Sequence, residues 1–401
     1  MIRRRALLTG LALLPRPALL PVSARGAAPK PLADRFIAPI LARLNALPAG
    51  PALLASYPDL TGSPARFATA NRHTAYVYDN ALAGLALLGS GHGFHATRIA
   101  DALVRAQNHD PDYHDGRLRN AYRAGAMTVP VALPGWWDAR LNQWVEDPYQ
   151  VGAEAGPIAW AILLWTHLIK AGFNAARYRH AAQRAANWIT STLRDQAGFR
   201  GGVFGFPPHP QQLGWVSTEQ NLDLAVAFAA LDQPAAAAHA RHFVRRMQDA
   251  KTHLFNAGLT PSGAINPMIA ADANLWPVLA GLAGAATAQQ ALARLGWPRS
   301  NPAGIGFSEA SQGIWMEGTG FAALALQRIG APALAARFAA TIAAHQSDGA
   351  YVLATSTPKL ATGLTIGPDR SAEQFDYYRV PALAPTAWAA MAQAGVSPFN
   401  L

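Results

Sequence analysis

Five apolar stretches of this chain begin beside an acidic residue, and an arginine-bearing amphipathic stretch follows each of them. A helix that is apolar on every side must be buried, whereas an amphipathic helix lies at the surface. The alternation therefore predicts inner helices wrapped by outer ones. The acids that begin the inner helices are Asp79, Glu154, Glu219, Asp272 and Glu317.

Twelve helices are predicted from these patterns. The apolar ones span residues 81–88, 158–169, 218–231, 273–282, 321–329 and 385–393, and the amphipathic ones span 31–48, 95–107, 175–194, 234–248, 286–295 and 332–345. Pairing the first amphipathic helix with the last apolar helix gives six hairpins. Closing the hairpins into a ring hides every inner face, so we expect an all-α (α/α)6 toroid with small β-hairpins in its loops. An open α-solenoid is the alternative, but uneven repeats and long polar loops favour a closed ring with a site at one mouth.

The first 28 residues have the pattern of an export signal. Arg3, Arg4 and Arg5 precede a short apolar run, and small residues follow near a possible cleavage point. Such a run is too short to span a bilayer, and the arginines ahead of it are typical of the twin-arginine class. We expect residues 1–28 to be removed, residues 29–401 to form one domain, and the protein to be periplasmic or secreted.

Composition excludes several kinds of chemistry. The chain has no cysteine, which rules out disulfides and thiol nucleophiles. Its formal net charge of +10 includes five arginines in the first 28 residues, and no cluster of basic and aromatic residues indicates nucleic-acid binding. No segment has the length and apolarity of a membrane span. The histidines lack metal-ligand spacing, so we expect no metal and no cofactor. We also expect the protein to be a monomer.

Residues 215–228 contain the most informative motif. Ser217 and Gln220 have the spacing of a helix capping box. Glu219 and Asp223 are four residues apart, which places both carboxylates on one face near the positive end of the helix. Two acids that open an apolar helix beside Trp215 predict the floor of a cleft.

Other inner helices begin in the same way. Asp79 follows Tyr78, and Glu317 follows Trp315 and precedes two glycines, which lower helix stability and indicate a need for close approach. Each of these acids also has a structural interpretation, as a helix cap or as a partner of the helix dipole. Asp223 fits a buried structural acid as well, and the acids at 154 and 272 lack aromatic neighbours in the sequence.

This layout resembles that of the six-hairpin glycosidases, in particular exported bacterial proteins associated with polysaccharides. The resemblance covers most of the mature chain, and its local motifs are residues 78–82, 217–223, 315–319 and 385–400. It implies hydrolysis of a glycosidic bond, usually with inversion. Inverting hydrolysis needs one carboxylic acid that protonates the leaving oxygen and one carboxylate that activates water.

Aromatic rings can raise the pKa of a carboxyl by desolvation and can stack on sugar rings. We therefore expect Glu219 to be the proton donor and Asp79 the base, with Glu317 and Asp223 as further catalytic candidates. The expected carbohydrate-binding residues are Trp215, Trp315, Tyr78, Trp136, Trp137, Asn221 and Tyr377. Trp136 and Trp137 stand in a long loop, where they could also serve as loop anchors.

Three other functions fit parts of the pattern. A polysaccharide lyase could use Asn120, Tyr122, Arg123 and Asn221, although an acid-rich mouth repels uronates. A relative of the terpenoid cyclases would share the toroid, but the chain lacks an Asp-x-Asp-Asp motif, and we expect no aromatic lining inside the ring. A non-catalytic carbohydrate-binding protein would keep the tryptophans and tolerate loss of the acids.

Overall fold

The computed structural model describes residues 34–346, 349–368 and 374–400. The predicted export signal, residues 1–28, lies outside the described residues. All twelve predicted helices are present. The six apolar helices are α3 (Val77–Gly89), α6 (Ala155–Lys170), α8 (Thr218–Ala230), α10 (Ala271–Leu279), α12 (Met316–Arg328) and α14 (Leu383–Ala394). The six amphipathic helices are α1 (Asp34–Asn45), α4 (Gly93–Asn108), α7 (Ala175–Thr192), α9 (Pro234–Arg246), α11 (Ala285–Leu295) and α13 (Pro332–Ala344).

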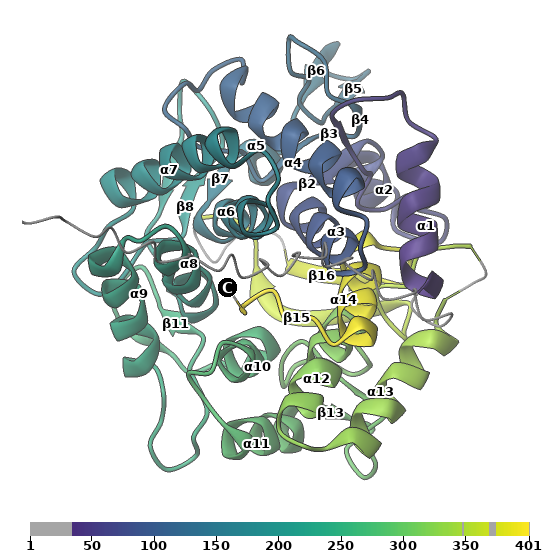
Figure 1. Cartoon of the computed structure of the whole chain (residues 1–401), viewed down its shortest axis with the longest axis vertical. Coiled ribbons are helices and arrows are strands. Elements are labelled where there is room, and N and C mark those ends of the chain that lie inside the picture. Colours follow the sequence, from purple (N-terminus) through teal and green to yellow (C-terminus); the bar gives the residue numbers. More distant parts are fainter. Residues whose placement is uncertain (1–33, 347–348, 369–373, 401) are drawn as a thin grey trace, which may run out of the picture. The chain divides into compact units, whose positions relative to one another are not determined.

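The apolar helices contact one another in chain order, and the last of them, α14, contacts the first, α3 (Figure 1). Each also packs mainly against the amphipathic helix that follows it in the chain, and the last, α14, packs mainly against α1, as the sequence predicts. An open solenoid would keep its first and last inner helices apart, so the contact between α14 and α3 excludes that alternative. The short helices α2 (Ala65–Asn71) and α5 (Pro148–Val151) lie in the loops.

Glycines allow neighbouring inner helices to approach closely. A Cβ added at Gly84 of α3 would lie 2.7 Å from a methyl carbon of Leu164 in α6. A Cβ added at Gly320 of α12 would lie 2.9 Å from the Cβ of Trp388 in α14. Real Cβ atoms do not approach this closely, so alanine at either position would push the two helices apart or force repacking.

Aromatic rings from several inner helices meet inside the ring of contacts. Trp276 lies 5.2 Å from Trp160 and 6.0 Å from Trp388 between ring centroids, and Phe321 and Phe399 pack against the same group. The three indoles are at most 1% exposed. Our expectation that the inner helices carry no aromatic lining is therefore wrong. These rings occupy the interior as core, since buried aromatic side chains contribute the largest apolar areas.

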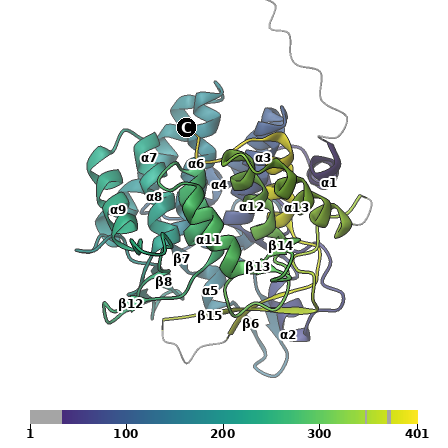
Figure 2. The ribbon, with the colours of Figure 1, turned by 90° about the horizontal axis from the view of Figure 1, so that it is seen from below.

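Short strands stand in the loops between the helices, and they gather at one end of the ring of inner helices (Figure 2). They form the pairs β1–β4, β2–β3, β5–β6, β13–β14 and β15–β16 and the three-stranded sheets β7–β8–β9 and β10–β11–β12. Their bounds are β1 (Ala52–Leu53), β2 (Thr74–Tyr76), β3 (Ala121–Arg123), β4 (Gly125–Ala126), β5 (Trp136–Asp138), β6 (Gln143–Val145), β7 (Ala153–Glu154), β8 (Gly202–Phe204), β9 (Gln211–Leu213), β10 (Val216–Ser217), β11 (Gly258–Leu259), β12 (Ile265–Asn266), β13 (Gly296–Trp297), β14 (Gly304–Ile305), β15 (Lys359–Thr365) and β16 (Gln374–Tyr378). The antiparallel pair β15–β16 lies between α13 and α14 in the sequence, and it crosses this end of the ring.

The fourth residue of five inner helices ties the helix to the loop before it. In α10, the Asn274 side chain accepts a hydrogen bond from the Phe255 N–H (2.8 Å) and donates to the carbonyls of Phe255 (3.1 Å) and Ala270 (2.9 Å). The side chains of Asn80, Asn221, Thr319 and Thr386 hold backbone groups in the same manner. We call these five side chains clamps, because each one fixes the residue at which its helix begins.

Among the described residues, no helix has both the length and the apolarity needed to cross a membrane.

The clamp at Asn274 gives the first prediction. The substitution Asn274→Ala leaves the buried N–H and the carbonyl of Phe255 without the partner that Asn274 supplies, so we expect it to lower the free energy of unfolding by about 2–4 kcal/mol. Urea denaturation measures this change. The matched control is Asn187→Ala on the exposed face of α7, which should change stability by less than about 0.5 kcal/mol. Equal effects of the two substitutions would show that the clamp does not fix the helix start.

Candidate active site

The helix starts bring their acids to the same end of the ring. Glu219, Asp272 and Glu317 are each the second residue of an inner helix, while Asp79 is the third residue of α3 and Glu154 is the residue directly before α6. The positive end of a helix favours negative charge, which reduces the cost of placing a carboxyl there. The loops and strands that the clamps hold in place then surround these side chains.

Two adjoining cavities open at this end. The larger, of about 620 Å³, is lined by Glu154, Glu219, Asp272 and Glu317, and the smaller, of about 360 Å³, is lined by Asp79 and Glu317. Both are also lined by Tyr78, Tyr149, Trp315, Phe375 and Tyr377. Since Phe375 and Tyr377 belong to β16, the β15–β16 hairpin contributes to the wall between the two cavities.

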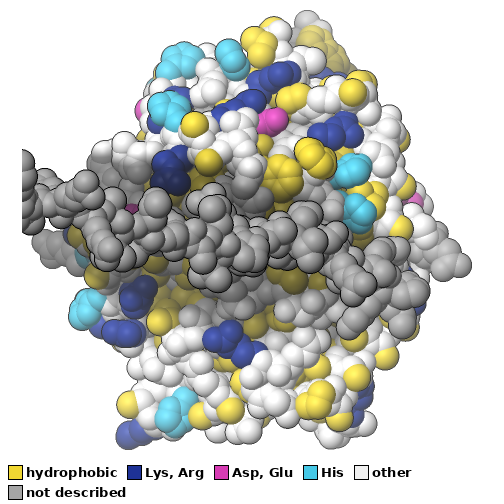
Figure 3. Space-filling view, in the orientation of Figure 1, with side chains coloured by type: hydrophobic (Ala, Val, Ile, Leu, Met, Phe, Trp, Pro, Cys, Tyr) yellow, Lys and Arg dark blue, Asp and Glu magenta, His cyan; other side chains and the backbone are white. Residues whose placement is uncertain are grey.

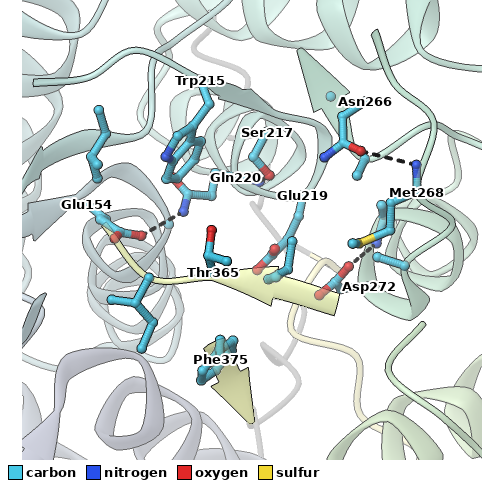
Figure 4. A pocket seen from close by; sticks show the side chains of 18 of the residues that line it. Glu154, Trp215, Ser217, Glu219, Gln220, Asn266, Met268, Asp272, Thr365 and Phe375 are labelled. Atoms are coloured by element: carbon cyan, nitrogen blue, oxygen red, sulfur yellow. Dashed lines mark hydrogen bonds between the residues drawn. The ribbon is translucent and has the colours of Figure 1, made fainter. Parts of the chain in front are cut away.

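Glu219 and Asp272 both line the larger cavity (Figure 4). The Glu219 side chain favours the ionised form of Asp272. Burial and the negative charge of Asp272 raise the pKa of Glu219 well above its usual value. Burial also raises the pKa of Asp272, to about 6, against the lowering effect of the Ala273 N–H. Glu219 is therefore the partner that holds the proton near neutral pH.

Glu317 lies where the two cavities meet. The Tyr78 hydroxyl donates a hydrogen bond of 2.5 Å to its carboxylate, and the Trp388 indole N–H donates to the Tyr78 oxygen at 3.1 Å. Burial raises the pKa of Glu317 well above its usual value, although the bond from Tyr78 opposes this shift. The Trp388–Tyr78–Glu317 chain links the carboxyl to the aromatic core inside the ring.

Asp79 lines only the smaller cavity and is 8% exposed. Burial raises its pKa to about 7, while the neighbouring Ser56 side chain acts in the opposite direction. A carboxyl with this pKa is partly ionised near neutral pH and can both accept and return a proton.

Glu154 lies at the opposite side of the larger cavity from Asp272 (Figure 4). The Gln220 amide donates a hydrogen bond of 3.1 Å to one carboxylate oxygen, and the Asn120 side chain accepts a bond of 2.8 Å from the Glu154 backbone N–H. Burial raises the pKa of Glu154 to about 7, while the Gln220 and Asn120 side chains lower it.

Aromatic rings form much of the remaining wall. Trp215 lines the larger cavity, and Trp315 and Tyr377 line both, with their ring centroids 5.4 Å apart and their planes inclined by 30°. Trp315 also packs against Phe307 at 5.0 Å. The predicted residues Tyr78, Trp215, Trp315 and Tyr377 are therefore brought together with the acids.

Four other predicted residues line neither cavity. Asp223 is fully buried and accepts a hydrogen bond from the Trp160 indole at 3.1 Å, and Asn221 is the fully buried clamp of α8. Trp136 and Trp137 belong to β5, where Trp137 is 59% exposed and lies opposite Trp144 of β6. The structure thus places the twin tryptophans on a surface hairpin outside both cavities, and it places Asp223 and Asn221 in the core.

Two acids that the sequence favours less as candidates, Glu154 and Asp272, do line the larger cavity. The sequence holds a spacing that points to Asp272. This acid stands two residues before the clamp Asn274, as Glu219 stands two residues before the clamp Asn221. Glu154 has no such spacing, because the fourth residue of α6 is Ile158.

Within the described ranges, no group of three or more His, Cys, Asp or Glu side chains is arranged to hold a metal ion.

Comparison with known proteins supports the fold. No protein-family model matches the sequence, and no curated protein matches it. A glycosidase variant in complex with glucose superposes with a TM-score of 0.58 at 14% identity, over 91% of this chain and 97% of that chain. A GH63 mannosylglycerate hydrolase from Thermus thermophilus, in complex with glucose, gives 0.54 at 13% identity, over 88% and 98%. A D-mannose isomerase gives 0.57 at 9% identity, over 90% and 96%. The chain therefore shares a fold with glycosidases of the six-hairpin kind, and this likeness supports the resemblance seen in the sequence.

The buried carboxyls predict a pH dependence of stability. A carboxyl whose pKa is raised by folding binds more protons in the folded state, so its contribution is fully present below the unfolded pKa near 4 and declines as the pH rises through the folded value. For Asp79, Glu154 and Asp272 the decline should fall between about pH 4 and pH 7.

We expect the free energy of unfolding to decrease across this range, and Asp79→Asn to remove roughly 1–3 kcal/mol of that decrease. Urea titrations at pH 4.5, 6 and 7.5 measure both effects. A wild-type stability that rises steadily with pH would contradict the assignment of raised pKa values.

Proposed function

We propose that this protein is a glycoside hydrolase built on an (α/α)6 toroid, acting on a neutral or basic polysaccharide or oligosaccharide with inversion. The observation that carries the proposal is the convergence of carboxyls from separate helix starts on two joined, aromatic-walled cavities. Most ligand pockets place a few polar groups among apolar walls in this way. The fold shared with glycosidases adds support.

Glu219 is the proposed proton donor. Its carboxyl is protonated near neutral pH because burial and Asp272 disfavour its charge, and a protonated acid is what the leaving oxygen of a glycosidic bond requires. Asp272 lines the same cavity, and its negative charge helps to keep the proton on Glu219. After the proton is transferred, the two carboxylates repel each other, which favours recovery of the proton for the next turnover.

Asp79 is the proposed base. It reaches the smaller cavity, whereas Glu219 reaches the larger one, so a sugar bound at the junction would have an acid on each side. Asp79 would take a proton from the water that attacks the anomeric carbon. Glu317 and its partner Tyr78 lie at this junction, where they would bind sugar hydroxyls beside the bond that breaks.

A lyase reaction and a sugar isomerisation are the two alternatives that assays of the purified protein can distinguish from hydrolysis. A lyase needs a tyrosine or histidine base with a group that neutralises a uronate, but Tyr122 is fully buried and its hydroxyl bonds to the backbone of Arg119 and to Asp110. A sugar isomerase is the other outcome, because a D-mannose isomerase shares the fold. Release of unsaturated ends would identify the lyase, and interconversion of free mannose and fructose would identify the isomerase.

We further propose that residues 1–28 direct export and that the mature protein acts in the periplasm as a monomer. Cell fractionation of a strain that expresses the full chain, with and without the Arg4→Lys and Arg5→Lys substitutions, tests the twin-arginine route.

The proposal predicts the behaviour of Glu219→Gln. This isosteric change removes the acid but keeps the side-chain volume, so we expect kcat on the best substrate to fall by about 10²–10⁴-fold while the unfolding midpoint changes little. Reducing ends released from a panel of bacterial glucans and exopolysaccharides are the readout. The matched control is Glu309→Gln, an exposed glutamate paired with Arg294 at 2.9 Å, which should retain full activity.

Retention of wild-type kcat by Glu219→Gln would remove this residue from the catalytic role. Absence of new reducing ends from every member of the panel with the wild-type protein would count against hydrolysis as a whole.

A further inference from the structure

The two cavities differ in charge. The described residues that line the larger cavity include four carboxyls and no lysine, arginine or histidine, whereas the smaller cavity is lined by Arg66 as well as by acids. The negative charges of Asp272, Glu154 and Glu317 raise the pKa of Glu219, and that of Asp272 also raises the pKa of Glu317. The larger cavity therefore disfavours anionic groups, and a cation that entered it would relieve this repulsion.

Glu154 accepts a hydrogen bond from a side-chain amide in this cavity. The Gln220 amide donates to its carboxylate at 3.1 Å, and this bond favours the ionised form. Gln220 directs its amide N–H at Glu154, while its own carbonyl oxygen has no hydrogen-bond partner within the described part of the chain, although the residue is only 8% exposed. A buried acceptor without a partner is costly, and it is satisfied when a donor binds beside it.

We propose that the larger cavity binds a sugar unit that carries a free amino group, a 2-amino-2-deoxyhexose, with its ammonium beside Glu154 and Gln220. An ammonium has three donors and no acceptor, which complements a carboxylate next to an unpaired amide oxygen. Trp215 lines the same cavity, where its ring offers a stacking surface for the sugar (Figure 4). This inference rests on the proposed function and names the substrate class as an amino-sugar polymer or oligomer.

The chemistry separates this ligand from its close relatives. An N-acetylated sugar of the same shape has no positive charge, and a glucose unit places a hydroxyl where the ammonium would be. A charge-assisted hydrogen bond is about twice as strong as a neutral one, so the loss of charge should cost at least about tenfold in affinity. A uronate would add to the repulsion and should bind most weakly.

The face of the molecule seen in Figure 3 offers few acidic side chains as a competing site among the residues that are coloured. Lysine and arginine side chains are spread over this face, whereas acidic side chains are few among the atoms that are coloured. An amino sugar bound with a carboxylate partner is therefore expected in the buried cluster of acids rather than on this face.

Calorimetric binding of glucosamine, N-acetylglucosamine, glucose and glucuronate to the full chain at about pH 6.5 tests the inference without any need for turnover. We expect glucosamine to bind at least about tenfold more tightly than the other three. The Glu154→Gln variant should bring glucosamine within about threefold of glucose, while the surface control Glu309→Gln keeps the full preference. Equal affinities of glucosamine and glucose for the wild-type protein would overturn the inference.

Hydrolysis of matched β-1,4 oligomers of glucosamine, N-acetylglucosamine and glucose separates this inference from the proposed function. A preference for glucosamine in binding, without cleavage of any oligomer or of the wider panel, would overturn the proposed function and leave the amino-sugar site standing. Cleavage of the glucose oligomer as fast as the glucosamine oligomer would overturn the amino-sugar inference and support hydrolysis.

Discussion

The burial of several carboxyls at one end of a ring of apolar helices is the constraint on which the rest of this molecule depends. Each carboxyl has left water, and Asp272, Glu154 and Glu317 all raise the pKa of Glu219, so the cluster costs stability wherever its members ionise. Three features reduce the cost: the positive ends of the inner helices, the hydrogen bonds from Tyr78 and Gln220, and the proton that Glu219 retains. Chains keep such costly groups chiefly where chemistry needs them.

The remainder of the structure serves to hold these groups in place. Glycines at 84 and 320 let the inner helices approach, and the Asn and Thr clamps fix the residue at which each helix begins. Below the acids, the indoles of Trp160, Trp276 and Trp388 fill the ring. Trp388 reaches from this core to Tyr78 and so to Glu317, which makes the position of one acid depend directly on the aromatic packing.

The sequence predicted the helices well, because the choice between an apolar and an amphipathic helix follows from side-chain pattern alone. It also predicted that Asp79, Glu219 and Glu317 would share one end, since helix starts of a closed ring converge. How deeply each side chain is buried was harder to predict. Asp223 lies on the same helix face as Glu219, but one turn further in it meets Trp160 instead of a cavity. Trp137 lies in a loop whose direction no local pattern specifies. Asp272 was underrated because its partner Glu219 is distant in the sequence, and only the ring brings the two together.

The central claim is that a sugar binds at the junction of the two cavities with its glycosidic oxygen beside Glu219. A crystal structure of the Glu219→Gln variant soaked with the best oligosaccharide tests it most directly. The account predicts a glycosidic oxygen within about 3.2 Å of the side chain at position 219, with the carboxyl of Asp79 on the other face of the sugar ring. Sugar density confined to the exposed hairpin of Trp137 and Trp144, with both cavities free of sugar, would contradict it.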